Sequence, residues 1–229
     1  MDKTVPTGAA MLLDFIGGIE APRGYDTIFG NNQNKLAVPL TSMALDDVIA
    51  AQKSWSKRFG SSASGRYQFM QATLQGLKSE LGLLGSQKFD ANLQDRLGYH
   101  LLRRRGYDDY VAGKITRVEF GKRIAQEWAS MPVLADMQGA HRPLKRGQSY
   151  YAGDALNKSL VAPEKLETVL ALVKKAPDPV AAPPGPVPPS PAPKPAPVTS
   201  PPVGVPVAAP KVSGWAALLA ALMKLFGKS

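Results

Sequence analysis

Hydrophobic residues recur at helical spacing through most of the first 175 residues. Apolar side chains three and four positions apart share one face of a helix. The clearest stripes are Leu12, Leu13, Ile16 and Ile19; Leu45, Val48 and Ile49; Phe69, Thr73, Leu74, Leu77 and Leu81; Phe89, Leu93, Leu97 and Leu101; and Phe120, Ile124 and Trp128. The pattern predicts a mainly helical domain in which these stripes form the core.

Several residues mark where the predicted helices begin and end. Asp90 stands where an N-cap is expected and Gly106 where the same helix stops. Thr116 and Glu119 have the spacing of a capping box. Pro163 lies in the first turn of a last predicted helix, a position that tolerates its missing N–H.

Strand signals are short and weak. The stretch "YDTIFGNN", residues 25–32, ends in turn residues and predicts a small hairpin arm. Small residues at 61–65 predict a flexible loop whose backbone other groups can approach closely. This loop leads to Arg66, Tyr67 and Gln68 at the start of a predicted helix. The predicted fold class is therefore α+β, mainly helical, with a small β-hairpin region.

The composition changes abruptly near Ala176 and divides the chain. Residues 5–175 read as a globular domain. Residues 176–212 are rich in proline, which fixes φ and removes hydrogen-bond donors, so we expect a disordered, semi-rigid linker. A PxxP ligand is the less favoured interpretation of this segment. Residues 213–229 read as a separate amphipathic helix.

This C-terminal helix is predicted to have one apolar side. That side consists of Trp215, Leu218, Leu219, Leu222, Leu225 and Phe226. The segment is shorter than a membrane span, so we expect contact with lipid in the membrane interface. A helix that folds back onto the domain or self-associates is the alternative.

Net charge and composition narrow the chemistry. The formal charge of +10 favours an acidic partner such as nucleic acid, anionic lipid or an anionic wall polymer. The chain has no cysteine and only His100 and His141, so we expect no thiolate nucleophile, no metal site and no cofactor. Catalysis would depend on carboxylates, hydroxyls and amides. The N-terminus lacks the pattern of a secretory signal, which predicts a cytoplasmic protein until it is released.

Glu20 is the most informative carboxylate. It lies one helical turn after Ile16 and two after Leu13, so it belongs to the apolar stripe that faces the core rather than to the solvent-exposed face of the helix. A carboxyl group in apolar surroundings has a raised pKa, as a general acid requires at neutral pH. The alternative is a helix-end glutamate held by an arginine such as Arg23. Asp14, on the same helix, is expected to be solvated.

The stretch "SGRYQ" has side chains suited to sugars, because guanidinium and amide groups bind hydroxyls and aromatic faces cover apolar ring surfaces. Core packing is the alternative for Tyr67 and is the favoured interpretation for Phe69. For Gln68 we favour sugar binding. Trp128 has the spacing of a core residue.

These motifs, in order, resemble the phage lambda-type endolysins, which are lysozyme-like peptidoglycan glycosidases. The resemblance rests on a glutamate ending the first helix, then "GYDTIFG", "SGRYQ" and "EWASMP". It runs from about Leu12 to Pro132, with weaker similarity as far as Val161. It implies that Glu20 is the catalytic acid/base. The residues implied to line the glycan cleft are Tyr25, Asp26, Gly65, Arg66, Tyr67 and Gln68. The chain departs from the family's frequent Ser-Glu, with Ile19 before the glutamate.

The resemblance also implies a function. Such enzymes are lytic transglycosylases that cleave between N-acetylmuramic acid and N-acetylglucosamine and leave 1,6-anhydro products during lysis of the host cell. A hydrolytic lysozyme, with Asp26 as the second carboxylate, is one alternative, although we favour a structural role for Asp26. A non-catalytic wall-binding or virion module is the other. The expected partners are peptidoglycan and a pore-forming lysis protein, and the expected state is a monomer.

Two further features have competing interpretations. The run from Arg103 to Arg105 resembles a nucleic-acid patch, but basic residues in a last helical turn also complement the helix dipole, which we favour. We therefore expect no nucleic-acid partner. Tyr150 and Tyr151 are either packing residues or part of a cleft rim.

Overall fold

A computed structural model of the chain describes residues 1–153 and 158–176. The predicted linker, apart from Ala176, and the predicted C-terminal helix lie outside the described residues. Those two predictions, and the domain boundaries drawn from them, therefore stay predictions.

Helices dominate the described residues. They are α1 (Thr7–Glu20), α2 (Leu45–Phe59), α3 (Gln71–Glu80), α4 (Ala91–Arg104), α5 (Tyr107–Val111), α6 (Arg117–Glu127) and α7 (Pro163–Lys175), with 3-10 turns at Phe29–Asn31, Gln33–Lys35 and Leu40–Ser42. Strands β1 (Met137–Gln138) and β2 (Pro143–Leu144) pair antiparallel, with Met137 opposite Leu144. A mainly helical fold with a small hairpin confirms the predicted class.

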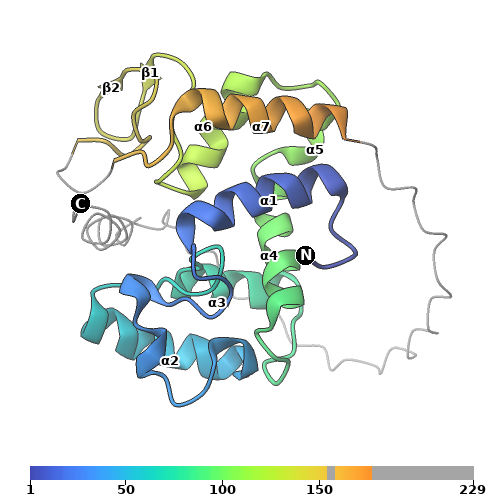
Figure 1. The fold of residues 1–229 in the computed structure, drawn as a ribbon. Helices are drawn as coiled ribbons and strands as arrows, with labels where there is room; N and C mark the ends of the chain where they lie inside the picture. The colour runs from blue at the N-terminus through green and yellow to red at the C-terminus, as the bar shows by residue number, and fades with distance from the viewer. Residues whose placement is uncertain (154–157, 177–229) are drawn as a thin grey trace, which may run out of the picture.

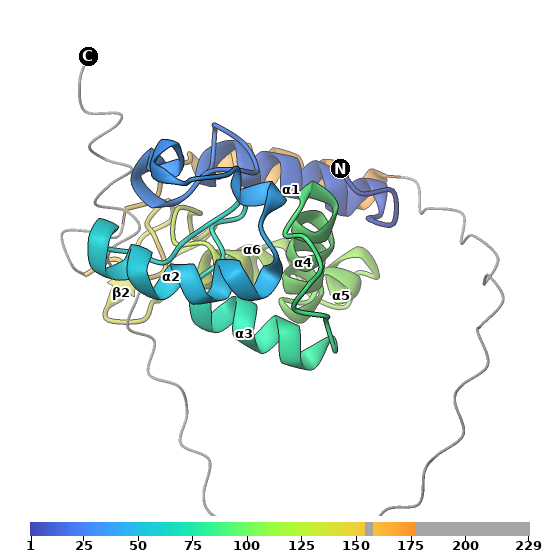
Figure 2. The same ribbon diagram turned by 90° about the horizontal axis from the view of Figure 1, so that it is seen from below.

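The helices form two groups on either side of α1. In Figure 1, α6, α7 and the hairpin lie above α1, and α2 and α3 lie below it. Helix α4 runs from one group to the other and packs against α1. Helix α7 also packs against α1, alongside it in Figure 1 and largely hidden behind it when the molecule is seen from below (Figure 2). The C-terminal end of α1 therefore lies at the junction of the two groups.

The predicted caps form as expected and most stripe residues are buried, but Leu81 lies after the end of α3 and is 39 % exposed. Asp90 Oδ1 accepts a hydrogen bond from the Leu93 amide at 2.8 Å, which caps α4. Thr116 Oγ1 accepts one from the Glu119 amide at 3.1 Å, which caps α6. Gly106 has a φ of 92°, which a β-carbon would strain, and α4 has ended before it.

The buried stripes meet in one core that extends through both groups of helices. Its fully buried members include Leu12, Leu13 and Ile16 of α1 and Phe120 and Ile124 of α6. Because α1 contributes to packing above and below, its axis and its C-terminal end are fixed by the core. A side chain on the last residue of α1 is therefore held in a defined position.

The predicted hairpin at residues 25–32 is wrong. Ile28 forms a single bridge with Ser64, and the chain then enters the 3-10 turn at Phe29. Gly30 and Asn31 have φ values of 70° and 57°, which interrupt a strand. Because Ile28 and Phe29 are both buried, the segment has no solvent-facing alternation of the kind a two-stranded arm requires.

The start of α3 also differs from the prediction. The helix begins at Gln71, not at Arg66. Ser64 and Phe69 bridge each other, with hydrogen bonds of 3.1 and 2.8 Å between their backbones, and the residues between them turn tightly. Gln68 has a φ of 51°, a left-handed conformation that no right-handed helix accommodates.

Candidate active site

Glu20 is the last residue of α1, and the local sequence explains why the helix stops there. Pro22 has no N–H to donate and disfavours helical geometry in the residue before it. Ala21 accordingly leaves the helix, with φ −143° and ψ 73°, while its amide still donates to the Gly17 carbonyl. The Glu20 side chain is 3 % exposed, so the carboxyl predicted to continue the apolar stripe is indeed buried.

The two oxygens of this carboxyl have different surroundings. Oε1 accepts a short hydrogen bond from the hydroxyl of Ser130, which is itself fully buried. Oε2 is buried and has no hydrogen-bond partner among the described residues. Buried polar atoms without partners are uncommon in folded proteins, and Oε2 is one of six such side-chain atoms among the described residues.

Burial controls the protonation of Glu20. Loss of solvation raises its pKa from the ordinary 4.5 to about 7, while the hydrogen bond from Ser130 acts in the opposite direction. Arg23 is exposed and forms no ion pair with Glu20, so the paired helix-end alternative is wrong. With this pKa, a substantial fraction of the carboxyl is protonated at neutral pH, as a general acid requires.

Ser130 belongs to the turn that follows α6. The Met131 amide donates to the Trp128 carbonyl at 2.9 Å and closes this turn. Trp128 is buried in the core, as its spacing predicted, and its indole N–H donates to the Tyr67 carbonyl at 3.2 Å. The sequence motif "EWASMP" contains this serine, but periodicity assigns it no role, because its partner lies far away in the chain.

Tyr25 and Tyr67 meet at a second buried carboxylate. Their hydroxyls donate to Oδ1 of Asp95 at 2.9 and 2.7 Å. Burial and the hydrogen bond to Asp95 raise the pKa of Tyr25 to about 12 and raise that of Tyr67 as well. Tyr67 is 1 % exposed, so its ring packs in the core, as the alternative interpretation predicted.

Sequence reasoning missed Asp95, which is fully buried in α4. Asp95 lies three residues before Gly98 and seven before Leu102, and both of these are buried. That spacing could have placed it on the inner face. A charged residue on an inner face implies a polar partner, here the two tyrosines.

Arg66 connects the "SGRYQ" turn to α1. Its amide donates to Gln94 Oε1 at 2.8 Å, and its guanidinium lies over the Tyr25 ring, with Cζ 5.2 Å from the ring centroid. It also pairs with the exposed Asp14 at 3.2 Å. Gly17 makes room for this side chain, because a β-carbon there would come within 2.7 Å of Arg66 Cγ.

The other predicted cleft residues shape backbone turns. Asp26 Oδ1 accepts from the Thr41 amide at 2.8 Å, which supports the structural role favoured for it. Gly65 has a φ of 77°. Gln68 is 6 % exposed and its side-chain amide donates to the Gly65 carbonyl at 2.8 Å. The structure thus brings Tyr25, Arg66 and Tyr67 together, whereas the Asp26 carboxyl bonds to the Thr41 amide.

Each arginine of the run at the end of α4 has an acidic partner. The N–O distances are 2.9 Å for Arg103–Asp108, 3.7 Å for Arg104–Glu80 and 2.6 Å for Arg105–Glu127. Paired guanidinium groups offer little charge to phosphates, so these contacts favour the helix-end interpretation over a nucleic-acid patch. Tyr151 donates to the Gln126 carbonyl at 2.8 Å, and Tyr150 packs against the core, which favours a packing role for both.

Comparison with known proteins is consistent with this geometry. The family model described as Endolysin matches residues 18–154, a span that contains both Glu20 and Ser130. The chain belongs to the endolysin family. This endolysin is accordingly a phage enzyme that degrades peptidoglycan during lysis. No curated protein and no solved structure matches the chain.

Two other properties bear on this endolysin. Within residues 1–153 and 158–176, no cluster of three or more histidine, aspartate or glutamate side chains is arranged to hold a metal ion. None of the helices in the same residues combines the length and the apolar character of a membrane-spanning segment.

Proposed function

We propose that this endolysin is a lytic transglycosylase that cleaves the β-1,4 bond between N-acetylmuramic acid and N-acetylglucosamine. The observation that carries the proposal is the buried Glu20 carboxyl, which has one oxygen bonded to Ser130 and the other without a partner among the described residues. Such a group can hold a proton at neutral pH and present it to a substrate atom.

In the first step, neutral Glu20 donates its proton to the glycosidic oxygen. The bond between this oxygen and C1 of the muramoyl sugar breaks, and the electron pair leaves with the oxygen as the hydroxyl of the N-acetylglucosamine product. Positive charge develops at C1 and on the ring oxygen of the muramoyl sugar. Glu20 is now a carboxylate that has kept its bond to Ser130.

In the second step, the Glu20 carboxylate removes the proton from the C6 hydroxyl of the same sugar. The C6 oxygen forms a bond to C1 and closes a 1,6-anhydro ring. Glu20 is neutral again, and no water has been consumed. Because attacking and attacked atoms belong to one sugar, the reaction avoids the entropy loss of binding a separate nucleophile.

The surroundings of the other carboxylates support a mechanism with a single glutamate. A hydrolytic glycosidase of the usual kind needs a second carboxylate beside the scissile bond. Asp26 is bonded to the Thr41 amide, Asp14 is paired with Arg66, and Asp95 accepts from two tyrosines. Each of these groups already has a structural partner.

We assign substrate contact to Tyr25 and Arg66, because both are partly exposed and stack on each other. A stacked ring and guanidinium offer an apolar face and several hydrogen-bond donors to a glycan. Gly65, Tyr67 and Gln68 would then act by holding the turn that carries Arg66.

Replacing Glu20 by glutamine tests the assignment, since the amide keeps the shape but cannot transfer the proton. We expect the Glu20→Gln variant to lose almost all clearing of a peptidoglycan suspension. Glu80→Gln is the matched control, because Glu80 is exposed and its ion pairs within the described residues are with His100 and Arg104. Clearing by Glu20→Gln at the parent rate would refute the role of Glu20.

Mass spectrometry of the released fragments then identifies the reaction. Fragments with 1,6-anhydro ends are expected from a transglycosylase. Fragments heavier by one water, with reducing ends, would show that the enzyme is a hydrolytic lysozyme instead.

A further inference from the structure

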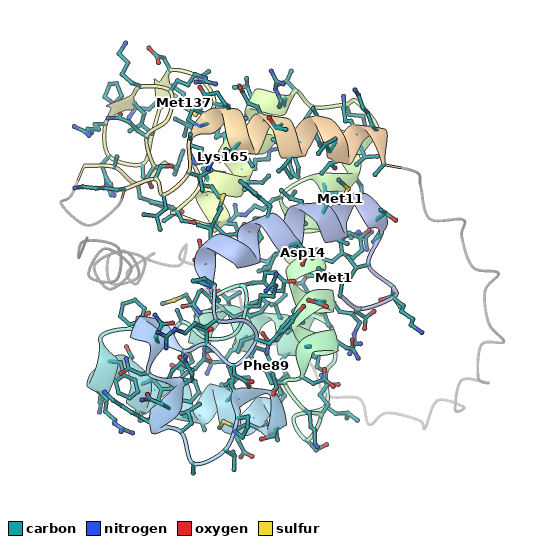
Figure 3. The ribbon with its side chains drawn as sticks, in the orientation of Figure 1. Met1, Met11, Asp14, Phe89, Met137 and Lys165 are labelled. Carbon is teal, nitrogen blue, oxygen red and sulfur yellow. The ribbon has the colours of Figure 1, made fainter. Side chains whose placement is uncertain are left out.

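A groove lies on the outer side of α1, between that helix and the segment that leads into α7. Its volume is about 380 Å³. Its walls include Phe15, Gly18 and Ile19 from α1, and Leu160, Val161 and Lys165 from the other side. Figure 3 shows Asp14 on α1 and Lys165 on the neighbouring α7, and both of these residues also line the groove.

The groove adjoins the catalytic carboxyl through a short chain of hydrogen bonds. The Leu160 amide donates to the Ser130 carbonyl at 2.9 Å, and the Ser130 hydroxyl donates to Glu20. On the α1 side, Ile19 directly precedes Glu20. The groove therefore lies within about one helical turn of Glu20, although Glu20 itself is not among the residues that line it.

The charges in the groove are unequal. Asp14 is paired with Arg66 at 3.2 Å. Lys165 is exposed, and among the ion pairs of the described residues it has no partner. The other lining side chains are apolar, but about half of the exposed lining is polar, so the groove offers apolar side chains beside polar groups and one positive charge without an ion pair. That combination suits a chain of small apolar groups bearing a carboxylate.

We propose that this groove binds the peptide stem of peptidoglycan, with Lys165 contacting a stem carboxylate. The inference rests on the proposed function, because the stem is attached to the muramoyl sugar whose C1 bond Glu20 would cleave. Alanine methyl groups of a stem match the apolar walls, and its carboxylates match Lys165. Stem binding would make the enzyme prefer peptide-bearing strands over bare glycan.

Two variants test the groove by different means. Lys165→Ala removes the charge. Gly18→Leu fills the space, because a β-carbon at Gly18 meets nothing within 4 Å and the backbone there is ordinary helix. The matched controls are Lys53→Ala, an exposed lysine of α2, and Gly76→Leu, a glycine of α3 with equally open surroundings.

The measurement is kcat/KM on intact wall and on strands from which an amidase has removed the stems. The ratio of interest is kcat/KM on intact wall divided by kcat/KM on strands without stems. We expect Lys165→Ala to lower this ratio about threefold, as for the loss of an exposed ion pair. Gly18→Leu should lower it further, through KM, and the controls should leave it unchanged. Thermal unfolding of each variant shows whether the domain is folded.

An unchanged ratio in both groove variants would overturn the inference. So would weaker binding to anionic vesicles at an unchanged ratio, which would mean that the groove is a lipid site. The Glu20→Gln variant separates this failure from failure of the proposed function. Suppose that Glu20→Gln is inactive on both substrates while the groove variants have the same ratio of kcat/KM values as the parent. The proposed catalytic role of Glu20 then stands, and only the proposed stem site is wrong.

Discussion

The hydroxyl of Ser130 donates a hydrogen bond to Oε1 of Glu20, although 110 residues separate them in the chain. Glu20 ends α1, and Ser130 lies in the turn after α6. The Ser130 carbonyl in turn accepts from the Leu160 amide at 2.9 Å and from the Ser159 hydroxyl at 3.3 Å. One buried serine thus joins three segments and leaves Oε2 of Glu20 as the carboxyl oxygen without a hydrogen-bond partner among the described residues.

Replacing Ser130 by alanine is expected to change the pH profile of the enzyme. The hydrogen bond from Ser130 lowers the pKa of Glu20, so its removal raises that pKa above about 7. Activity that requires neutral Glu20 should then persist to higher pH. We also expect kcat to fall about tenfold, since one hydrogen bond of about 1 to 1.5 kcal/mol no longer orients the carboxyl. The measurement is kcat on purified wall between about pH 5 and 9.

A matched control is Ser149→Ala, which removes a buried hydroxyl that donates to the Ala129 carbonyl at 2.7 Å. It should destabilise the fold without shifting the pH at which activity falls on the alkaline side of the profile, the alkaline limb. If both variants move the limb equally, or if Ser130→Ala leaves it in place, Ser130 does not set the protonation of Glu20.

The raised pKa of Glu20 also predicts how stability depends on pH. The folded protein keeps the proton up to about pH 7, whereas an unfolded chain loses it near the ordinary value of 4.5. The free energy of unfolding should therefore decrease as pH rises through this window. The full decrease is about 3 kcal/mol at about 1.4 kcal/mol for each pH unit.

Glu20→Gln cannot ionise, so it should lack this component. We expect the variant to gain stability relative to the parent as the pH increases from about 4 to 8, by up to about 3 kcal/mol. Urea unfolding of both proteins at several pH values gives the comparison. A constant difference between them across this range would mean that the carboxyl is not sheltered in solution.

The sequence predicted the helices well because each depends on local spacing. Stripes such as Leu12 to Ile19, the cap at Asp90 and the proline at the start of α7 act within a few residues. The burial of Glu20 followed from the same spacing. Ser130 and Asp95 could not be assigned roles in this way, because their partners come from other segments and are set by how the helices pack.

The loops were less predictable for a different reason. A short stretch with turn residues can form a hairpin arm or a single bridge followed by 3-10 turns. Here the second arrangement forms, because it buries Ile28 and Phe29. Gln68 adopts a left-handed conformation, so α3 begins only at Gln71. The residue type does not predict this conformation, because glutamine rarely adopts it.

The arginine run offers a stability test with an internal control. Arg105 donates to Glu127 at 2.6 Å, and the Glu127 side chain is largely buried, whereas Arg103 pairs with the exposed Asp108. Arg105→Ala leaves a buried carboxylate without its partner and should cost about 1 to 2 kcal/mol, because Arg105 is itself about one-third exposed. Arg103→Ala should cost less than about 1 kcal/mol. Equal losses in urea unfolding would contradict the assigned difference in burial.

The turn that carries Arg66 depends on Gly65 for two reasons, its left-handed φ and the lack of space for a β-carbon. Comparison with Gly82 separates these two reasons. Both Gly65 and Gly82 have left-handed φ values, 77° and 59°, so alanine at either position should cost about 1 to 2 kcal/mol in backbone strain. A β-carbon at Gly82 meets nothing within 4 Å. At Gly65 it would lie 2.5 Å from Oε1 of Gln94, an atom that accepts from the Arg66 amide at 2.8 Å.

Gly65→Ala should therefore destabilise the protein by about 1 to 3 kcal/mol more than Gly82→Ala, because it also breaks the buried hydrogen bonds of Gln94. Those bonds include donation to the Tyr25 carbonyl at 3.1 Å, so Gly65→Ala should raise KM for peptidoglycan as well. Urea unfolding and kinetics on purified wall measure the two effects. If Gly65→Ala lost stability but kept its KM, the turn would support the fold without placing Tyr25 and Arg66 for the glycan. An unchanged stability would instead mean that Gln94 can move aside, and the tight packing of this turn would not be what positions Arg66.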